Sequence, residues 1–123
     1  MKKVLIVEDE PTLAEMYRDI FAKNEFEAHH ASSVNRALEI VKEEKPDIIL
    51  LDILLPGETG ISFLIKLRRL DGVVSETMVV AFSNYDDKET KEEAFDLGVK
   101  DYLIKTDNTP REILQKSVKY LEK

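Results

Sequence analysis

Five short strand-like segments, most of them runs of aliphatic residues, alternate with segments of helical periodicity, and this alternation constrains the fold more than any other feature. One of them, Ile48-Ile49-Leu50-Leu51, shows no polar alternation, which is typical of a parallel strand covered on both faces by helices. Right-handed crossovers place successive helices on both sides of such a sheet. The order therefore predicts an α/β fold with a doubly wound, five-stranded parallel sheet. The expected strands are residues 3–7, 26–31, 48–51, 77–82 and 102–104.

Helical segments separate the expected strands, and several have a recognisable start. Pro11 suits the first turn of the first helix, and either Ser32 or Ser33 is expected to cap the second. Thr109 and Glu112 form a capping box that opens the last helix. Apolar residues recur in the first helix at the spacing of one buried face. The residues expected on that face are Leu13, Met16, Tyr17, Ile20 and Phe21.

The fourth helix, at about residues 87–97, carries few apolar side chains. Only Ala94, Phe95 and Leu97 are expected to be buried in it. Gly98 follows at the position where a residue in the left-handed conformation commonly ends a helix. We therefore expect this helix to be the least firmly packed of the fold.

The composition indicates one domain that spans residues 1–123 and buries its own core, because 43% of the residues are hydrophobic. Cysteine is absent, and the apolar stretch near the N-terminus is too short for a signal peptide or a membrane span. We therefore expect a cytoplasmic protein without a membrane partner, whose sequence ends with the domain. The formal net charge of -7 repels phosphate backbones, so direct nucleic-acid binding is not expected.

Polar side chains follow four of the expected strands. Glu8 and Asp9 come after the first strand, and Asp52 comes after the third. Ser83 and Lys105 follow the fourth and fifth strands. Because ligands of open parallel sheets bind outside the carboxyl ends of the strands, we expect these five side chains to converge on one functional edge.

The chemistry of these residues favours metal-assisted phosphoryl transfer. Three carboxylates in one place repel one another unless a cation lies between them. Oxygen ligands without cysteine select a hard metal, and Mg²⁺ suits a site of few carboxylates better than Ca²⁺, while Mn²⁺ would also fit. Asp52, central in the sheet, is then the candidate nucleophile. Lys105 and the Ser83 hydroxyl can each pair with a phosphate oxygen.

Four motifs follow one another along the chain: Val4 to Glu10, Pro46 to Asp52, Leu55-Pro56 with Gly60, and Asp101 to Lys105. Together they resemble the receiver domains of bacterial response regulators. The resemblance spans essentially the whole chain, and every motif is in order. It implies a flavodoxin-like fold of five βα units with sheet order 2-1-3-4-5, as in the chemotaxis member of the family. It also implies a phosphoprotein of two-component signal transduction that is not a turnover enzyme.

The resemblance implies roles for individual residues around the acidic group. Asp52 would accept a phosphoryl group from a histidine kinase or a histidine phosphotransfer protein. The metal would be held by Glu8, Asp9 and Asp52 together with the backbone carbonyl of Leu54.

The resemblance also implies a switch made of Ser83 and Tyr102. Phosphorylation would draw the Ser83 hydroxyl inward and leave space into which Tyr102 rotates. The face made by the fourth helix, the fifth strand and the last helix would then bind a downstream protein. The domain is expected to be a monomer or a phosphorylation-dependent dimer.

Three features depart from the pattern of the family. Thr106 follows Lys105 where the family usually has Pro, so the resemblance does not extend to the usual cis peptide bond. Asn84 stands where Ala or Gly is common and is expected to narrow access to the phosphoryl group. Leu54 and Tyr85 occupy the positions that flank the hydrolytic water. Two bulky side chains there predict a long-lived phosphorylated state.

Three other functions are considered. A flavin-binding flavodoxin needs Gly, Ser and Thr donors after the first strand, where the sequence has Glu8-Asp9-Glu10. A haloacid dehalogenase-type phosphatase needs a second Asp two residues after the nucleophile, where the sequence has Leu54. A degenerate receiver that only binds proteins is disfavoured by the intact acidic set. The His29-His30 pair lacks a third metal ligand nearby in the sequence, so a surface role is favoured for it.

Overall fold

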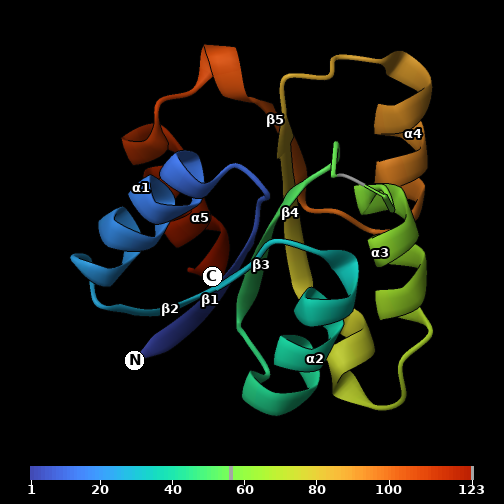
Figure 1. The fold of residues 1–123 in the computed structure, drawn as a ribbon, viewed down its shortest axis with the longest axis horizontal. Helices are drawn as coiled ribbons and strands as arrows, with labels where there is room; N and C mark the ends of the chain where they lie inside the picture. Colours follow the sequence, from blue (N-terminus) through green and yellow to red (C-terminus); the bar gives the residue numbers. More distant parts are fainter. Residues whose placement is uncertain (56, 123) are drawn as a thin grey trace.

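The computed structural model describes residues 1–55 and 57–122. Pro56, which belongs to one of the family motifs, and Lys123, at the end of the expected domain, lie outside the described residues. Five parallel strands form one sheet in the order β2-β1-β3-β4-β5, which confirms the predicted fold and strand order (Figure 1). The strands are β1 (Lys2–Val7), β2 (Phe26–Ala31), β3 (Ile48–Asp52), β4 (Met78–Ser83) and β5 (Asp101–Ile104).

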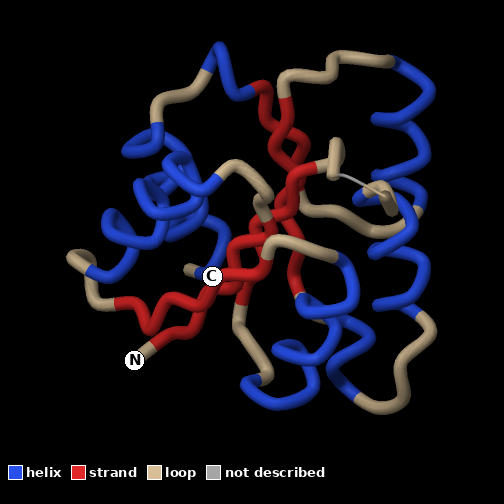
Figure 2. Tube along the Cα trace, in the orientation of Figure 1, coloured by secondary structure: helices blue, strands red, loops and turns tan. Residues whose placement is uncertain are grey.

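Helices cover both faces of the sheet, and Figure 2 shows the strands as a central layer between them. Helices α1 and α5 lie on one face, whereas α2, α3 and α4 cover the other (Figure 1). A short 3₁₀ helix, η1, precedes β4 and was not expected from the sequence. The helices are α1 (Pro11–Ala22), α2 (Val34–Glu44), α3 (Gly60–Arg68), η1 (Val73–Glu76), α4 (Lys88–Asp96), η2 (Lys105–Asp107) and α5 (Pro110–Leu121).

The core consists of two layers, because successive side chains of a strand point to opposite faces of the sheet. In β1, Val4 and Ile6 pack on the side of α1 with Tyr17. Leu5 and Val7 pack on the side of α2 and α3. All five residues of β3 are buried, as the unbroken apolar run predicts for a strand covered on both faces.

Two apolar side chains that were expected in the core are exposed, Met16 by 43% and Phe95 by 48%. The prediction was wrong for both. Each is the immediate neighbour of a buried residue, Tyr17 in α1 and Ala94 in α4. Consecutive helical residues point about 100° apart, so a neighbour of the central buried residue faces outward. Leu97, by contrast, packs against the core as expected.

Local signals at the helix ends agree with the sequence analysis. The Ser33 side chain, rather than that of Ser32, caps α2. Thr109 and Glu112 form the predicted capping box of α5. Gly98 has a φ of 84°, the left-handed conformation expected after α4. Across the described ranges, every helix falls short of the length and apolar character that a bilayer crossing requires.

Candidate functional site

The carboxyl ends of β1, β3, β4 and β5 lie at one edge of the sheet, and the structure brings the expected site residues together there. Asp52 is the last residue of β3, and Ser83 is the last residue of the neighbouring strand β4. Glu8 directly follows β1, which pairs with β3 on its other side. Lys105 directly follows β5. The topology therefore makes neighbours of residues that lie up to 97 positions apart.

Three carboxylates form the acidic centre of this edge. Glu8, Asp9 and Asp52 each offer an oxygen, and these atoms lie within 4.8 Å of one another. Glu8 is 1% exposed and Asp52 is 4% exposed, whereas Asp9 is open to solvent. The group is thus reachable from outside through Asp9 while its two other members are shielded.

Lys105 supplies a cation to the two buried carboxylates. Its Nζ lies 2.6 Å from Glu8 Oε1 and 3.0 Å from Asp52 Oδ2. Burial disfavours the ammonium form, but the hydrogen bond to Glu8 and the charge of Asp52 outweigh burial and raise the pKa of Lys105 above its ordinary value. The side chain therefore carries a full positive charge at neutral pH.

The residues present fit a divalent metal ion of the hard class. Three carboxylates against one ammonium leave two negative charges, which a divalent cation would match. All three donors are oxygens, the ligands that Mg²⁺ and Mn²⁺ prefer. Asp52 keeps acceptor capacity although both of its oxygens are bonded, because each carboxylate oxygen has two lone pairs.

Backbone groups fix the orientation of the two buried carboxylates. The Leu54 N–H donates to Asp52 Oδ1 over 3.0 Å, and the Glu10 N–H donates to Glu8 Oε2 over 3.1 Å. A side chain that the sequence analysis placed at the surface contacts the main chain of Glu8, since His30 Nε2 lies 2.7 Å from the Glu8 carbonyl oxygen. The signal for His30 was its place near the end of a strand that pairs with β1.

Tyr17 of α1 was expected only as a core residue, but the charges of the acidic centre also act on its hydroxyl. Burial, together with the negative charges of Glu8 and Asp52, raises the pKa of its hydroxyl to about 12. Its ring makes an edge-on contact with Phe82, with centroids 5.0 Å apart. A neutral phenol thus borders the carboxylates on the side of α1.

Gly60 allows α3 to begin directly against the loop that follows Asp52. Its N–H donates to the Ile53 carbonyl over 2.8 Å. A Cβ atom at this position would lie 2.7 Å from the Ile53 Cα and 2.8 Å from the Asp52 carbonyl oxygen. Only glycine fits this close approach, so Gly60 positions the loop that carries Leu54.

The two expected switch residues are joined through the backbone of Tyr85. Ser83 Oγ accepts a hydrogen bond from the Tyr85 N–H over 3.0 Å, and the Tyr102 hydroxyl donates to the Tyr85 carbonyl over 2.6 Å. Ser83 is fully buried and Tyr102 is 8% exposed. The ring of Tyr102 therefore lies inside, in the kind of position that the sequence analysis expected after phosphorylation.

The positions that depart from the family pattern lie in the loops that follow the strands of the site. Leu54 is 51% exposed and Tyr85 is 43% exposed, so both side chains face solvent beside the acidic centre. Asn84 is exposed as well. Within the described residues no peptide bond is cis, and this includes the bond between Lys105 and Thr106.

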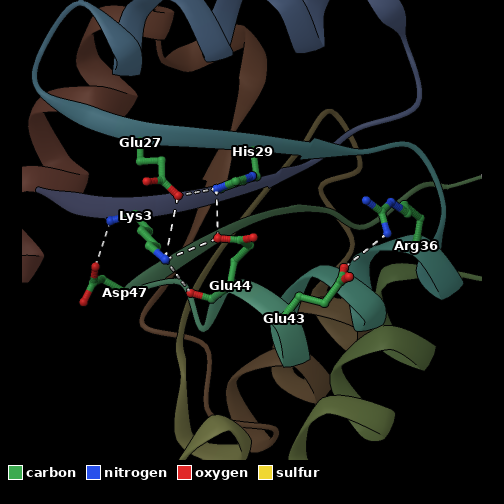
Figure 3. A network of polar contacts seen from close by, with 7 residues as sticks. All are labelled: Lys3, Glu27, His29, Arg36, Glu43, Glu44 and Asp47. Atoms are coloured by element: carbon green, nitrogen blue, oxygen red, sulfur yellow. Dashed lines mark hydrogen bonds and ion pairs between the residues drawn. The ribbon is translucent and has the colours of Figure 1, made fainter.

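A second polar cluster is formed by residues of β1, β2 and α2 (Figure 3). Oxygens and nitrogens of Glu27, His29 and Glu44 lie within 4.8 Å of one another. Lys3 Nζ reaches both carboxylates, at 3.7 Å from Glu27 and 3.2 Å from Glu44 (Figure 3). His29 Nε2 lies 2.7 Å from Glu27. Because Lys3 already provides the cation, this cluster is an ion-pair network that joins β2, β1 and α2.

Comparison with known proteins gives one consistent result. The family model of the response regulator receiver domain matches residues 4–117. The phosphate regulon transcriptional regulatory protein PhoB of Escherichia coli is 31% identical over 113 residues, which are 92% of this chain and 48% of PhoB. The chain thus spans about half the length of that curated relative.

Solved structures of similar domains share the fold over nearly the whole chain. A putative response regulator from Chloroflexus aurantiacus has a TM-score of 0.86 at 27% identity, with 99% of this chain and 98% of the other covered. The BeF3-activated N-terminal receiver domain of Klebsiella pneumoniae RstA has a TM-score of 0.84 at 28% identity, with 99% and 100% covered.

Proposed function

Because the chain belongs to the response regulator receiver domain family, we propose that Asp52 accepts a phosphoryl group from a histidine kinase or a histidine phosphotransfer protein in a Mg²⁺-dependent reaction. The observation that supports this most strongly is the position of the Asp52 carboxylate. It is 4% exposed, it ends the central strand, and it lies within one small group with Glu8, Asp9 and Lys105. No other carboxylate in the described residues combines these features.

The proposed transfer uses side chains that are already in place. An oxygen of Asp52 attacks the phosphorus of a phosphohistidine, so a P–O bond forms while the P–N bond breaks and the departing nitrogen takes up a proton. Lys105, now 3.0 Å from Asp52 Oδ2, can exchange this contact for one with a phosphoryl oxygen. The Ser83 oxygen accepts a hydrogen bond from the Tyr85 N–H, and its own O–H can donate to another phosphoryl oxygen.

The metal in this proposal is Mg²⁺, with Mn²⁺ as a substitute. The residues that would hold it are Glu8, Asp9 and Asp52, with the backbone carbonyl of Leu54. When bound, the ion offsets negative charge on the phosphoryl oxygens. The chain's own contribution is the fixed orientation of Glu8 and Asp52 by backbone N–H groups, which leaves little freedom to lose on binding.

The proposal extends to the output of the domain. The face formed by α4, β5 and α5 would bind a downstream protein or a second copy of the domain after phosphorylation, and the unphosphorylated domain would be a monomer. The domain would not turn over a separate substrate. The proposal includes a cytoplasmic location, which we expect from the sequence. It also includes a long-lived phosphorylated state, because Leu54 and Tyr85 would shield the phosphoryl group from water.

The test is phosphorylation by a small donor with and without the metal. Intact mass spectrometry of the protein with acetyl phosphate and Mg²⁺ should show the addition of one phosphoryl group, and a chelator should prevent it. Labelling that is unaffected by the chelator would contradict the metal-dependent mechanism. A yellow protein, or steady release of phosphate from a small ester, would instead support the flavodoxin or the dehalogenase alternative.

A further inference from the structure

Arg68, the last residue of α3, lies where the end of α4 and the segment before β4 meet. Its guanidinium donates to four backbone carbonyl oxygens, two from each of these segments. Nε donates to Leu97 over 2.8 Å and Nη2 donates to Gly98 over 3.2 Å. Nη1 donates to Ser75 over 3.1 Å and to Thr77 over 2.8 Å.

These contacts use most of the N–H donors of Arg68. All of the acceptors are backbone carbonyls, which carry no net charge. Among the residues that the structure describes, no carboxylate forms an ion pair with this guanidinium. Burial lowers the pKa of Arg68, but an arginine remains charged at neutral pH. Leu97 and Gly98 lie at the carboxyl-terminal end of α4, where the helix dipole is negative and a cation is favourable.

The amino-terminal end of α4 is held differently. Asp87 caps the helix by accepting from the Thr90 N–H over 2.9 Å, and Lys91 pairs with Asp86, so these contacts stay within the same short segment. Lys91 Nζ also lies 5.7 Å from the centre of the Tyr102 ring. Ala94 is the one fully buried residue of the helix. Two hydrogen bonds from Arg68 thus hold the carboxyl-terminal end, whereas the segment before the amino-terminal end receives one from Tyr102, at the Tyr85 carbonyl.

We propose that Arg68 is a positioning residue that fixes the carboxyl-terminal end of α4, so that switching moves the amino-terminal end of this helix about a pivot at Leu97 and Gly98. This inference rests on the proposed phosphorylation of Asp52. Any rearrangement of Ser83 and Tyr102 acts on the backbone of Tyr85, which lies just before the amino-terminal end of α4. The same arginine holds the segment that enters β4, so that strand stays fixed at the end opposite Ser83.

Amide hydrogen exchange of the wild-type protein, with and without beryllofluoride and Mg²⁺, tests the pivot. We expect the beryllofluoride-dependent change to be large for residues 85–91 and small for residues 96–99. The amides of Leu97, Gly98 and Val99 are suitable reporters, because each donates to a carbonyl of the last turn of α4. An equal change at both ends of α4 would overturn the pivot.

Variants of Arg68 test the cause. Arg68→Met keeps most of the chain length but removes the donors, so the amides of residues 97–99 should exchange about tenfold faster or more without beryllofluoride. The beryllofluoride-dependent change should then extend along the whole helix. Arg68→Lys keeps the charge with three donors, and it should restore part of the protection even if Arg68→Met folds poorly. Arg69→Met, at the exposed neighbour, should leave all rates unchanged.

The outcomes separate this inference from the proposed function. If Arg68→Met, or Arg68→Lys where the first variant does not fold, leaves the exchange of residues 97–99 as in the wild type, Arg68 does not fix this end of α4. That comparison needs no ligand. Absence of any response to beryllofluoride in the wild type would instead contradict the phosphorylation proposal and the pivot that rests on it. Both Arg68 variants should still accept a phosphoryl group from acetyl phosphate, because the arginine lies at the opposite end of β4 from the site.

Discussion

Nζ of Lys105 lies 2.6 Å from Oε1 of Glu8, and this contact joins the residue after β5 to the residue after β1. Both side chains are shielded, with Lys105 14% and Glu8 1% exposed. The ion pair spans the acidic site, since the same ammonium also contacts Asp52. Lys105 therefore offsets the charge of both carboxylates and links the residue after β5 to the residue after β1.

Replacing this lysine should destabilise the fold as well as the reaction. Lys105→Met leaves two shielded carboxylates without their cation, so we expect the free energy of unfolding at neutral pH to fall by about 2–4 kcal/mol. Added Mg²⁺ should recover more stability in this variant than in the wild type, because the ion supplies the missing positive charge. Urea denaturation with and without Mg²⁺ measures both effects. Lys119→Met, an exposed replacement on α5, is the control, and equal loss in the two variants would refute the role of Lys105.

Even the smallest substitution of Gly60 should destabilise the fold. Gly60→Ala places a Cβ atom against the backbone of Asp52 and Ile53, so α3 and the loop must separate. We expect a loss of about 1–3 kcal/mol in unfolding free energy and slower labelling by acetyl phosphate. Gly57→Ala is the matched control, because its Cβ atom would have no neighbour within 4 Å. The strain in that variant comes only from the backbone φ of 80°. Equal labelling rates in Gly60→Ala and the wild type would contradict a positioning role.

The affinity for the metal should depend on the one exposed carboxylate of the acidic centre. Asp9→Ala removes one of three oxygen donors, and we expect Mg²⁺ affinity to fall tenfold or more, which is about 1.4 kcal/mol. Isothermal titration calorimetry measures the affinity directly. Asp19→Ala, which removes an exposed carboxylate from α1, should leave it unchanged. An unaltered affinity in Asp9→Ala would show that the metal binds elsewhere.

The Tyr17 hydroxyl should lose its proton only at high pH, and the free energy of unfolding should therefore fall as the pH rises through the alkaline range. Its pKa is about 12 because burial and the charges of Glu8 and Asp52 disfavour the phenolate. An unfolded tyrosine titrates near 10, so the stabilisation is complete below about pH 10 and is lost as pH rises towards 12, in total about 2–3 kcal/mol. Tyr17→Phe should lose less stability over this range.

Ultraviolet titration of the folded protein checks the same point. Of the four tyrosines, Tyr17 and Tyr120 should ionise near pH 12, the second because of burial and its hydrogen bond to Asp101. Tyr17→Phe should reduce the amplitude of the phase near pH 12. If the late phase keeps its full amplitude in Tyr17→Phe, the assignment to Tyr17 is wrong.

The sequence was sufficient for the fold because local and global signals agree. Unbroken apolar runs, caps and glycines predicted a parallel five-stranded sheet and most helix ends, and the position of Asp52 after a buried strand predicted its place at the edge. The strand order was implied by the resemblance to receiver domains. The exceptions have a common cause. Met16 and Phe95 lie about 100° from the centre of their buried stripes, and a pattern of apolar residues does not resolve which neighbour faces inward.

Contacts between side chains and distant backbone atoms could not be predicted in this way. His30 reaches the Glu8 carbonyl and Arg68 reaches four carbonyls because of how non-adjacent elements pack. For His30 the only signal was its place near the end of a strand that pairs with β1, and for Arg68 the sequence offered none. The inward position of Tyr102 is of the same kind, since it depends on the path of the backbone at Tyr85.

The central claim is that Asp52 alone accepts the phosphoryl group, and intact mass spectrometry of three proteins tests it most directly. After incubation with acetyl phosphate and Mg²⁺, the wild type and the control Asp47→Asn, which changes an exposed carboxylate just before β3, should each gain the mass of one phosphoryl group. Asp52→Asn should gain none, because an amide is a poor nucleophile. Full labelling of Asp52→Asn would contradict the account.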